Sequence, residues 1–117
     1  MISIVSEDLQ GVPVVYLSGA FEPQDTEDFK RYVFDLADQL SDNRLIIDVA
    51  NLDSASSGIL RVMVLVQRKL AMLDGSLVVT GATGRVREIL QLSQVDSLLD
   101  LRTCAHEAAS GMARSVA

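Results

Sequence analysis

This 117-residue chain contains two adjacent serines followed by a glycine: Ser56, Ser57 and Gly58. The serine hydroxyls are groups that could accept a phosphate. A serine at a helix N-terminus lies beside backbone N–H groups that have no partner within the helix. Such groups stabilise an anion, for example a phosphate carried by the serine. The same residues also suit a helix cap, in which a serine oxygen accepts an N–H hydrogen bond. The two serines by themselves leave both interpretations open.

A buried strand and an apolar helix must position these serines. Residues 45–49 form an apolar, β-branched run that is typical of a buried strand, and small polar residues from Asn51 to Ser57 then predict a turn. After Gly58 the apolar residues recur at helical spacing as far as residue 73. Val64 and Leu65 make this helix more apolar than one buried face requires, so we expect it to be buried on two sides or to carry a contact surface. This setting favours the functional interpretation of the serines.

The rest of the chain alternates between strand and helix patterns. The runs that predict strands are residues 2–5, 12–17, 45–49, 76–80 and 95–101. The runs that predict helices are residues 22–40, 58–73, 83–90 and 103–112. A polar break at 6–8 and a turn at Gln10-Gly11 predict an opening hairpin, with Pro13 on an edge strand and Thr83 capping the third helix. We therefore expect an α/β domain with a mixed sheet of four to five strands and helices packed mainly on one side.

Length and composition limit the classes of protein that fit. The chain is long enough for one domain, residues 1–117, in which we expect residues 103–117 to form a weakly packed C-terminal helix. The net charge of −6 disfavours nucleic acid and anionic membranes as partners. Cys104 is the single cysteine, and neither a secretory signal nor an apolar run long enough for membrane insertion is visible. We expect a cytoplasmic protein.

The usual catalytic and cofactor motifs do not fit. His106 and Cys104 are the single histidine and cysteine, and two such residues do not make a metal site. No G-x-S-x-G motif accompanies the serines, and the glycine pair Gly81 and Gly84 lacks the lysine of a phosphate-binding loop. We therefore expect a protein that is not an enzyme and that has no metal or cofactor of its own.

Three segments together resemble a STAS domain of the anti-sigma-factor antagonist type. They are LSGAFEPQDTEDFK at residues 17–30, LIIDVANLDSASSGIL at residues 45–60, and DGSLVVTGATGRVREILQLSQVDSLLDL at residues 74–101. The resemblance covers nearly all of the chain, from about residue 2 to residue 101. It implies the STAS fold, with a serine-containing turn that opens the second helix.

The resemblance also implies a function and a set of site residues. Ser56 falls at the position of the serine that a partner kinase phosphorylates, with Ser57 as the reserve acceptor. The implied partners are a serine kinase that is also the anti-sigma factor and uses ATP, and a serine phosphatase. The dephosphorylated protein would bind the kinase, and the phosphorylated protein would be released. We expect the surrounding partner surface to comprise Glu22, Asp53, Ser57, Gly58, Ile59 and Arg61.

One departure from the family pattern keeps other functions open. The residue before the acceptor is usually Asp, and here it is Ala55. A STAS subunit that is not phosphorylated and that docks on the ATPase of a membrane transporter is therefore an alternative. A scaffold or ligand-sensing STAS module is a further alternative, and the sequence leaves open whether the chain forms a dimer.

Overall fold

A five-stranded mixed sheet forms the centre of the molecule. The computed structural model describes residues 2–40, 43–54, 57–82, 84–92 and 100–102. Its elements are β1 (Ile2–Leu9), β2 (Val12–Ala20), the 3-10 turn η1 (Pro23–Asp25), α1 (Thr26–Asp38), β3 (Arg44–Ser54), α2 (Ser57–Ala71), β4 (Ser76–Thr80), α3 (Gly84–Leu92) and β5 (Asp100–Arg102). The strands lie in the order β1-β2-β3-β4-β5, with β1 antiparallel to β2 and the other pairs parallel. The predicted α/β fold is confirmed.

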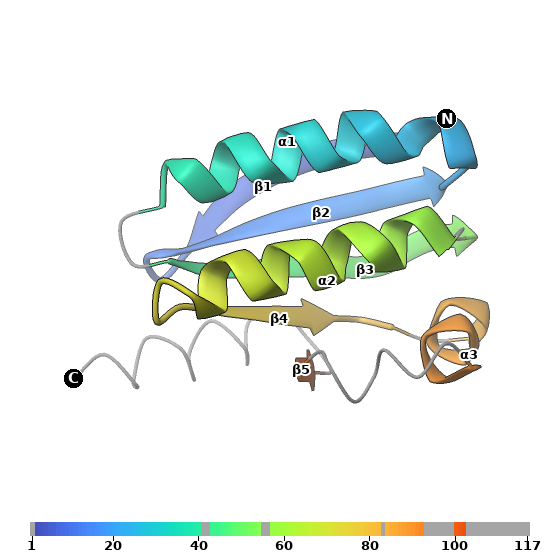
Figure 1. Cartoon of the computed structure of the whole chain (residues 1–117). Helices are drawn as coiled ribbons and strands as arrows, with labels where there is room; N and C mark the ends of the chain where they lie inside the picture. Colours follow the sequence, from blue (N-terminus) through green and yellow to red (C-terminus); the bar gives the residue numbers. More distant parts are fainter. Residues whose placement is uncertain (1, 41–42, 55–56, 83, 93–99, 103–117) are drawn as a thin grey trace.

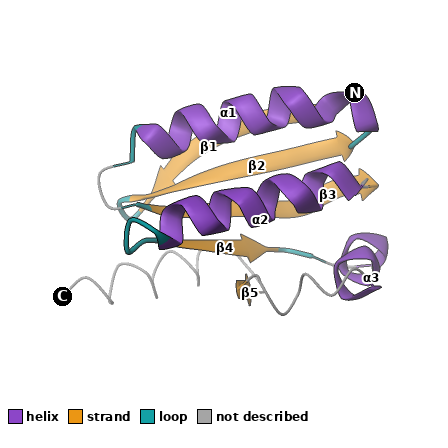
Figure 2. Cartoon of the chain, in the orientation of Figure 1, coloured by secondary structure: helices purple, strands orange, loops and turns teal. Residues whose placement is uncertain are grey.

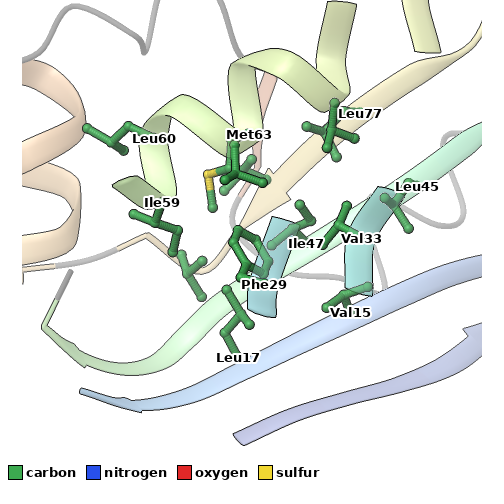
Figure 3. Packing of buried hydrophobic residues seen from close by; sticks show 14 of the residues in the cluster. Val15, Leu17, Phe29, Val33, Leu45, Ile47, Ile59, Leu60, Met63 and Leu77 are labelled. Atoms are coloured by element: carbon green, nitrogen blue, oxygen red, sulfur yellow. The ribbon is translucent and has the colours of Figure 1, made fainter. Parts of the chain in front are cut away.

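Helices α1 and α2 cover one face of the sheet and run side by side (Figures 1 and 2). Their apolar residues meet those of β2, β3 and β4 in the main core, where Phe29 of α1 and Met63 of α2 are almost fully buried (Figure 3). Phe29 also packs edge-on against Phe21, with ring centroids 5.5 Å apart. Burial of one such side chain stabilises the fold by about 1.5–3 kcal/mol. The core therefore fixes both helices against the same face.

A second, smaller cluster contains the alternate residues of the strands. It consists of Val12, Val14, Ile46 and Val78, with Leu9 and Tyr16 packed against it. Because successive side chains of a strand point to opposite faces, this cluster lies on the other face of the sheet from the main core. No residue of the described helices belongs to it. The helices that the structure describes thus pack on one side of the sheet, as expected.

The first and third strands are longer than the sequence indicates. The polar residues 6–8 were expected to break the first strand, and they instead continue β1 in register with β2. They are exposed because β1 is an edge strand. The polar residues Asn51, Asp53 and Ser54 were expected in a turn, and they instead extend β3, where Asn51 pairs with Ser18 and Ser54 with Ala20. Hydrogen bonding to β2 overrides the polar composition at this point.

The expectation that Pro13 lies on an edge strand is wrong, because β2 lies between β1 and β3. Its missing N–H is nevertheless tolerated, since the pairing of β2 with β3 begins one residue later, at Val14 and Ile46. Thr83 as a helix cap and the helix at 103–112 lie outside the described residues. So do residues 95–99 of the predicted strand 95–101, whose last two residues lie in β5 (Asp100–Arg102).

Candidate functional site

The turn between β3 and α2 lies at the end of the sheet where β2 and β3 finish and both α1 and α2 begin. Figure 1 shows the two helix starts at the right, beside the arrowheads of β2 and β3. This arrangement follows from the topology, because the helix of each parallel crossover begins at the carboxyl end of the strand that precedes it. Two helix N-termini therefore lie near the serine turn, and each carries N–H groups that the helix itself leaves without partners.

The chain is held firmly immediately before the turn. The N–H of Phe21 donates a hydrogen bond to the carbonyl oxygen of Ser54 at 3.1 Å, and Ala20 pairs with the same residue. The last residue of β3 is thus fixed to the segment that leads from β2 into η1. Ser56 lies outside the described residues, and Ser57 is the first residue of α2.

Gly58 sets the distance between the starts of α2 and α1. A Cβ atom on Gly58 would lie 2.2 Å from Oγ1 of Thr26 and 3.0 Å from its Cγ2. Real Cβ atoms do not approach neighbours so closely, so the Thr26 side chain would have to shift for any larger residue at position 58. The glycine of the predicted motif therefore has a packing role that is independent of any phosphate.

Glu22 caps the turn that leads into α1. Its backbone N–H donates to Oδ2 of Asp25 at 2.9 Å, and the N–H of Asp25 donates to the carbonyl oxygen of Glu22 at 2.9 Å. The side chain of Glu22 closes a reciprocal capping box and also accepts a hydrogen bond from Gln24. The exposed carboxylate is thereby held at the start of α1, at the same end of the sheet as the serines.

Asp48 fixes the point at which β3 extends beyond β4. Its pairing with Thr80 is the last between the two strands. The buried Asp48 carboxylate accepts a hydrogen bond from Thr80 Oγ1 at 2.7 Å and one from the N–H of Ala50 at 3.0 Å. These bonds satisfy a buried carboxylate and tie β3 to β4 six residues before the end of β3.

The neighbouring Tyr16 belongs to the same row of the sheet, paired with Asp48. Burial, the hydrogen bond that its hydroxyl donates to Glu7 at 3.0 Å, and the negative charges of Glu7 and Asp48 raise the pKa of Tyr16 to about 12.

The predicted partner-surface residues differ in how exposed their side chains are. Asp53 near the end of β3 and Arg61 in the first turns of α2 are exposed, as is Glu22. The inclusion of Ile59 is wrong, because its side chain is only 1% exposed and belongs to the main core. Its place at the third residue of α2 points it toward the sheet. The sequence did not predict Thr26 as a residue of this site. Its contact with Gly58 depends on how α1 and α2 pack, which no local sequence pattern indicates.

Other kinds of site have little support in the described part of the chain. No three histidine, cysteine or acidic residues among the described ones are grouped as a metal site would require. No described helix has both the length and the apolar character needed to cross a bilayer. A cavity of about 250 Å³ lies at the opposite end of the sheet from the serine turn, by the β1–β2 turn and the end of α1. Its lining residues include Asp8, Pro13 and Leu40.

Comparison with known proteins agrees with this architecture. The anti-sigma factor antagonist from Mycobacterium paratuberculosis is 22% identical, with a TM-score of 0.82 over 97% of this chain and 95% of that one. The unphosphorylated form of SpoIIAA, an anti-sigma factor antagonist from Bacillus, is 16% identical, with a TM-score of 0.81 over 98% of this chain and 99% of that one. Its phosphorylated form is also 16% identical, with a TM-score of 0.72 over 94% and 99%.

These likenesses establish the fold, and the family follows from the sequence. No curated protein sequence matches the chain significantly. A family model described as "Mlab, STAS domain" matches residues 5–101, which is most of the chain. Because this model matches far more than half of the chain, the chain belongs to the STAS domain family.

Proposed function

We propose that this chain is a cytoplasmic anti-sigma-factor antagonist that works by partner switching and has no catalytic activity of its own. In this scheme the dephosphorylated protein binds a serine kinase that is also the anti-sigma factor, and the sigma factor is released. The kinase uses ATP to phosphorylate Ser56, with Ser57 as the reserve acceptor, and a serine phosphatase reverses the modification.

The position of the serine turn carries this proposal. The turn follows the fixed end of β3 and opens α2, and the first residues of α2 pack against α1 through Gly58 and Thr26. Because β3 and α2 hold the chain on both sides of the turn, a hydroxyl at this position suits a kinase, which must align one oxygen with the phosphate of ATP. The structural neighbour SpoIIAA is known in an unphosphorylated and a phosphorylated form, which supports a modification of this kind here.

The physics of the added phosphate indicates how the switch works. A phosphoserine carries about −1.5 to −2 charges at neutral pH. The positive end of a helix dipole stabilises a neighbouring negative charge by about 0.3–1 kcal/mol, so the modified domain stays folded. A partner that covers the turn must instead bury this charge, which is costly without a counter-charge. The phosphate therefore acts on the complex and not on the fold.

Peptide mass spectrometry of the protein after incubation with its cognate kinase and ATP tests the proposal. Phosphate on Ser56 is the expected result, and phosphate on Ser57 would keep the switch and move its position by one residue. An active kinase that leaves both serines unmodified would overturn the proposal. The double variant Ser56→Ala/Ser57→Ala is the matched control and should take up no phosphate.

Ala55 favours one second candidate function. If the acid that is absent at this position is needed by the kinase, the domain would act without phosphorylation, as an accessory subunit that docks on the ATPase of a membrane transporter. Purification of a stable complex with such an ATPase, together with unmodified serines, would establish this alternative.

A further inference from the structure

The face of the sheet opposite helices α1 and α2 is buried, and we call it the second face. Val12 and Val14 of β2, Ile46 of β3 and Val78 of β4 have side chains that are at most 4% exposed. The helices that the structure describes contribute no residue to this cluster. Since an apolar side chain on an open sheet face stays accessible to water, a further layer must cover β2, β3 and β4 on this side.

Neighbouring side chains on the second face show where the cover ends. Asp48 of β3 and Thr80 of β4 follow the cluster residues of their strands two positions later, and both are buried. Tyr16 of β2 is half-buried, whereas Val5, which pairs with Tyr16 on the edge strand β1, is 57% exposed. The covering layer therefore lies over β3 and β4, reaches β2 and leaves β1 open to solvent.

Residues 103–117, which we call the C-terminal segment, begin at the right place and are long enough to form this layer. The segment follows β5, which pairs with β4 at the edge of the sheet. Helix α3, which precedes β5, places Val86 and Leu90 in the main core. Three strand spacings separate β5 from β2, about 14 Å in all. A helix formed by the segment would be about 22 Å long, which is sufficient to cross them.

The sequence of the C-terminal segment predicts a helix with one apolar side. Its apolar residues recur every three or four positions, which places them along one side of a helix. They are Cys104, Ala105, Ala108, Ala109, Met112 and Val116. The polar residues His106, Ser110 and Arg114 recur with the same period on the opposite side. Such a segment has one side suited to an apolar sheet face and one suited to water.

We propose that the C-terminal segment folds back as a helix over the second face and buries the β2–β4 cluster with its apolar side. Parallel strands occur almost only in sheets that are covered on both faces, and β2 to β5 are parallel to one another. This inference assigns the second face to the chain itself. A partner or a second copy that binds there must first displace the segment.

Paramagnetic relaxation measured by NMR tests this placement in the intact chain. A nitroxide is attached to the Ser110→Cys variant, on the polar side of the predicted helix, with Cys104→Ser to remove the native thiol. We expect the amide signals of Val14, Ile46 and Val78 to lose most of their intensity. The amides of α1 should lose little, because α1 lies beyond the sheet (Figure 1).

The same label on an Arg31→Cys variant, at an exposed position of α1, is the matched control. It should reverse the pattern, with a larger loss at Phe29 of α1 than at Val78. Unchanged β2–β4 signals in the Ser110→Cys sample would overturn the proposal. A loss that appears only when nitroxide-labelled and isotope-labelled chains are mixed would also overturn it, because a second copy would then form the cover.

Met112→Asp tests the apolar contact independently. The proposal places Met112 against the cluster, where a carboxylate is costly to bury. We expect the midpoint of urea unfolding to fall by roughly 1 M. Ser110→Asp adds the same charge on the polar side and should unfold like wild type. Equal midpoints for the Met112→Asp and Ser110→Asp variants would overturn the contact.

Discussion

Thr26 and Gly58 join the starts of α1 and α2, at a separation that would leave a Cβ atom on Gly58 only 2.2 Å from the Thr26 hydroxyl oxygen. This contact places the N-termini of two helices beside the same turn. It also means that packing favours glycine at position 58, whether or not the neighbouring serines are ever modified.

Gly58→Ala should destabilise the protein although alanine is the better helix former. The gain in helix propensity is about 1 kcal/mol, whereas overpacking against Thr26 costs about 1–3 kcal/mol. We expect a net loss of up to about 2 kcal/mol in the free energy of unfolding, measured in urea. Thr26→Ala removes the clashing hydroxyl, so the double variant should recover part of this loss. Equal effects of Gly58→Ala with and without Thr26→Ala would contradict the contact.

Ser56→Asp should weaken kinase binding without unfolding the domain. The substituted carboxylate places a negative charge at the start of α2, where the helix dipole tolerates it and a covering partner does not. We expect at least a tenfold rise in the dissociation constant, with a melting temperature within a few degrees of wild type. Ser76→Asp, at an exposed position where β4 starts, is the control for added charge. Equal binding by the Ser56→Asp variant and wild type would count against the switch.

The Asp48–Thr80 hydrogen bond should contribute measurably to stability. Thr80→Val keeps the shape of the side chain and removes the hydroxyl that donates to the buried carboxylate at 2.7 Å. A buried acceptor that loses its donor costs about 1–3 kcal/mol, which urea unfolding resolves. Thr80→Ser keeps the donor and removes only a methyl group, so it should be the milder change. A Thr80→Val variant as stable as Thr80→Ser would show that the bond contributes little.

Tyr16 should make stability fall at high pH. Its pKa is raised from 10.0 to about 12, because burial, the hydrogen bond to Glu7 and nearby carboxylates all disfavour the phenolate. The folded protein therefore holds this proton more tightly than the unfolded chain does. The resulting stability is complete below pH 10 and is lost as the pH rises toward 12.

Urea unfolding across this alkaline range checks the prediction. Tyr16→Phe should flatten the decline in the free energy of unfolding. Tyr32→Phe is the control, because it removes the hydroxyl that donates to Ser6 at 2.8 Å. This variant should show the same alkaline decline in the free energy of unfolding as wild type. Identical alkaline profiles for wild type and the Tyr16→Phe variant would refute this role of the phenol.

The sequence predicts most of the fold because hydrophobic periodicity reports which face of an element is buried. It misplaces the ends of β1 and β3, where polar residues such as Glu7 and Asn51 stay in a strand because a neighbouring strand supplies their hydrogen bonds. It also misplaces Ile59, whose burial depends on the exact residue at which α2 begins. The Thr26–Gly58 contact joins residues 32 positions apart in the chain, so only packing reveals it. Local pattern thus predicts elements better than it predicts their contacts.

The strand order of the sheet has a consequence for folding kinetics. Because the strands lie in the order in which the chain supplies them, each strand pairs with its predecessor across one tight turn or one crossover. The connections therefore close one at a time, and the entropy cost of each closure grows only slowly with its length. During synthesis each new strand adds to the free edge of the existing sheet. The elements that flank the serine turn, namely β2, β3 and the starts of α1 and α2, can therefore assemble before the last strand leaves the ribosome.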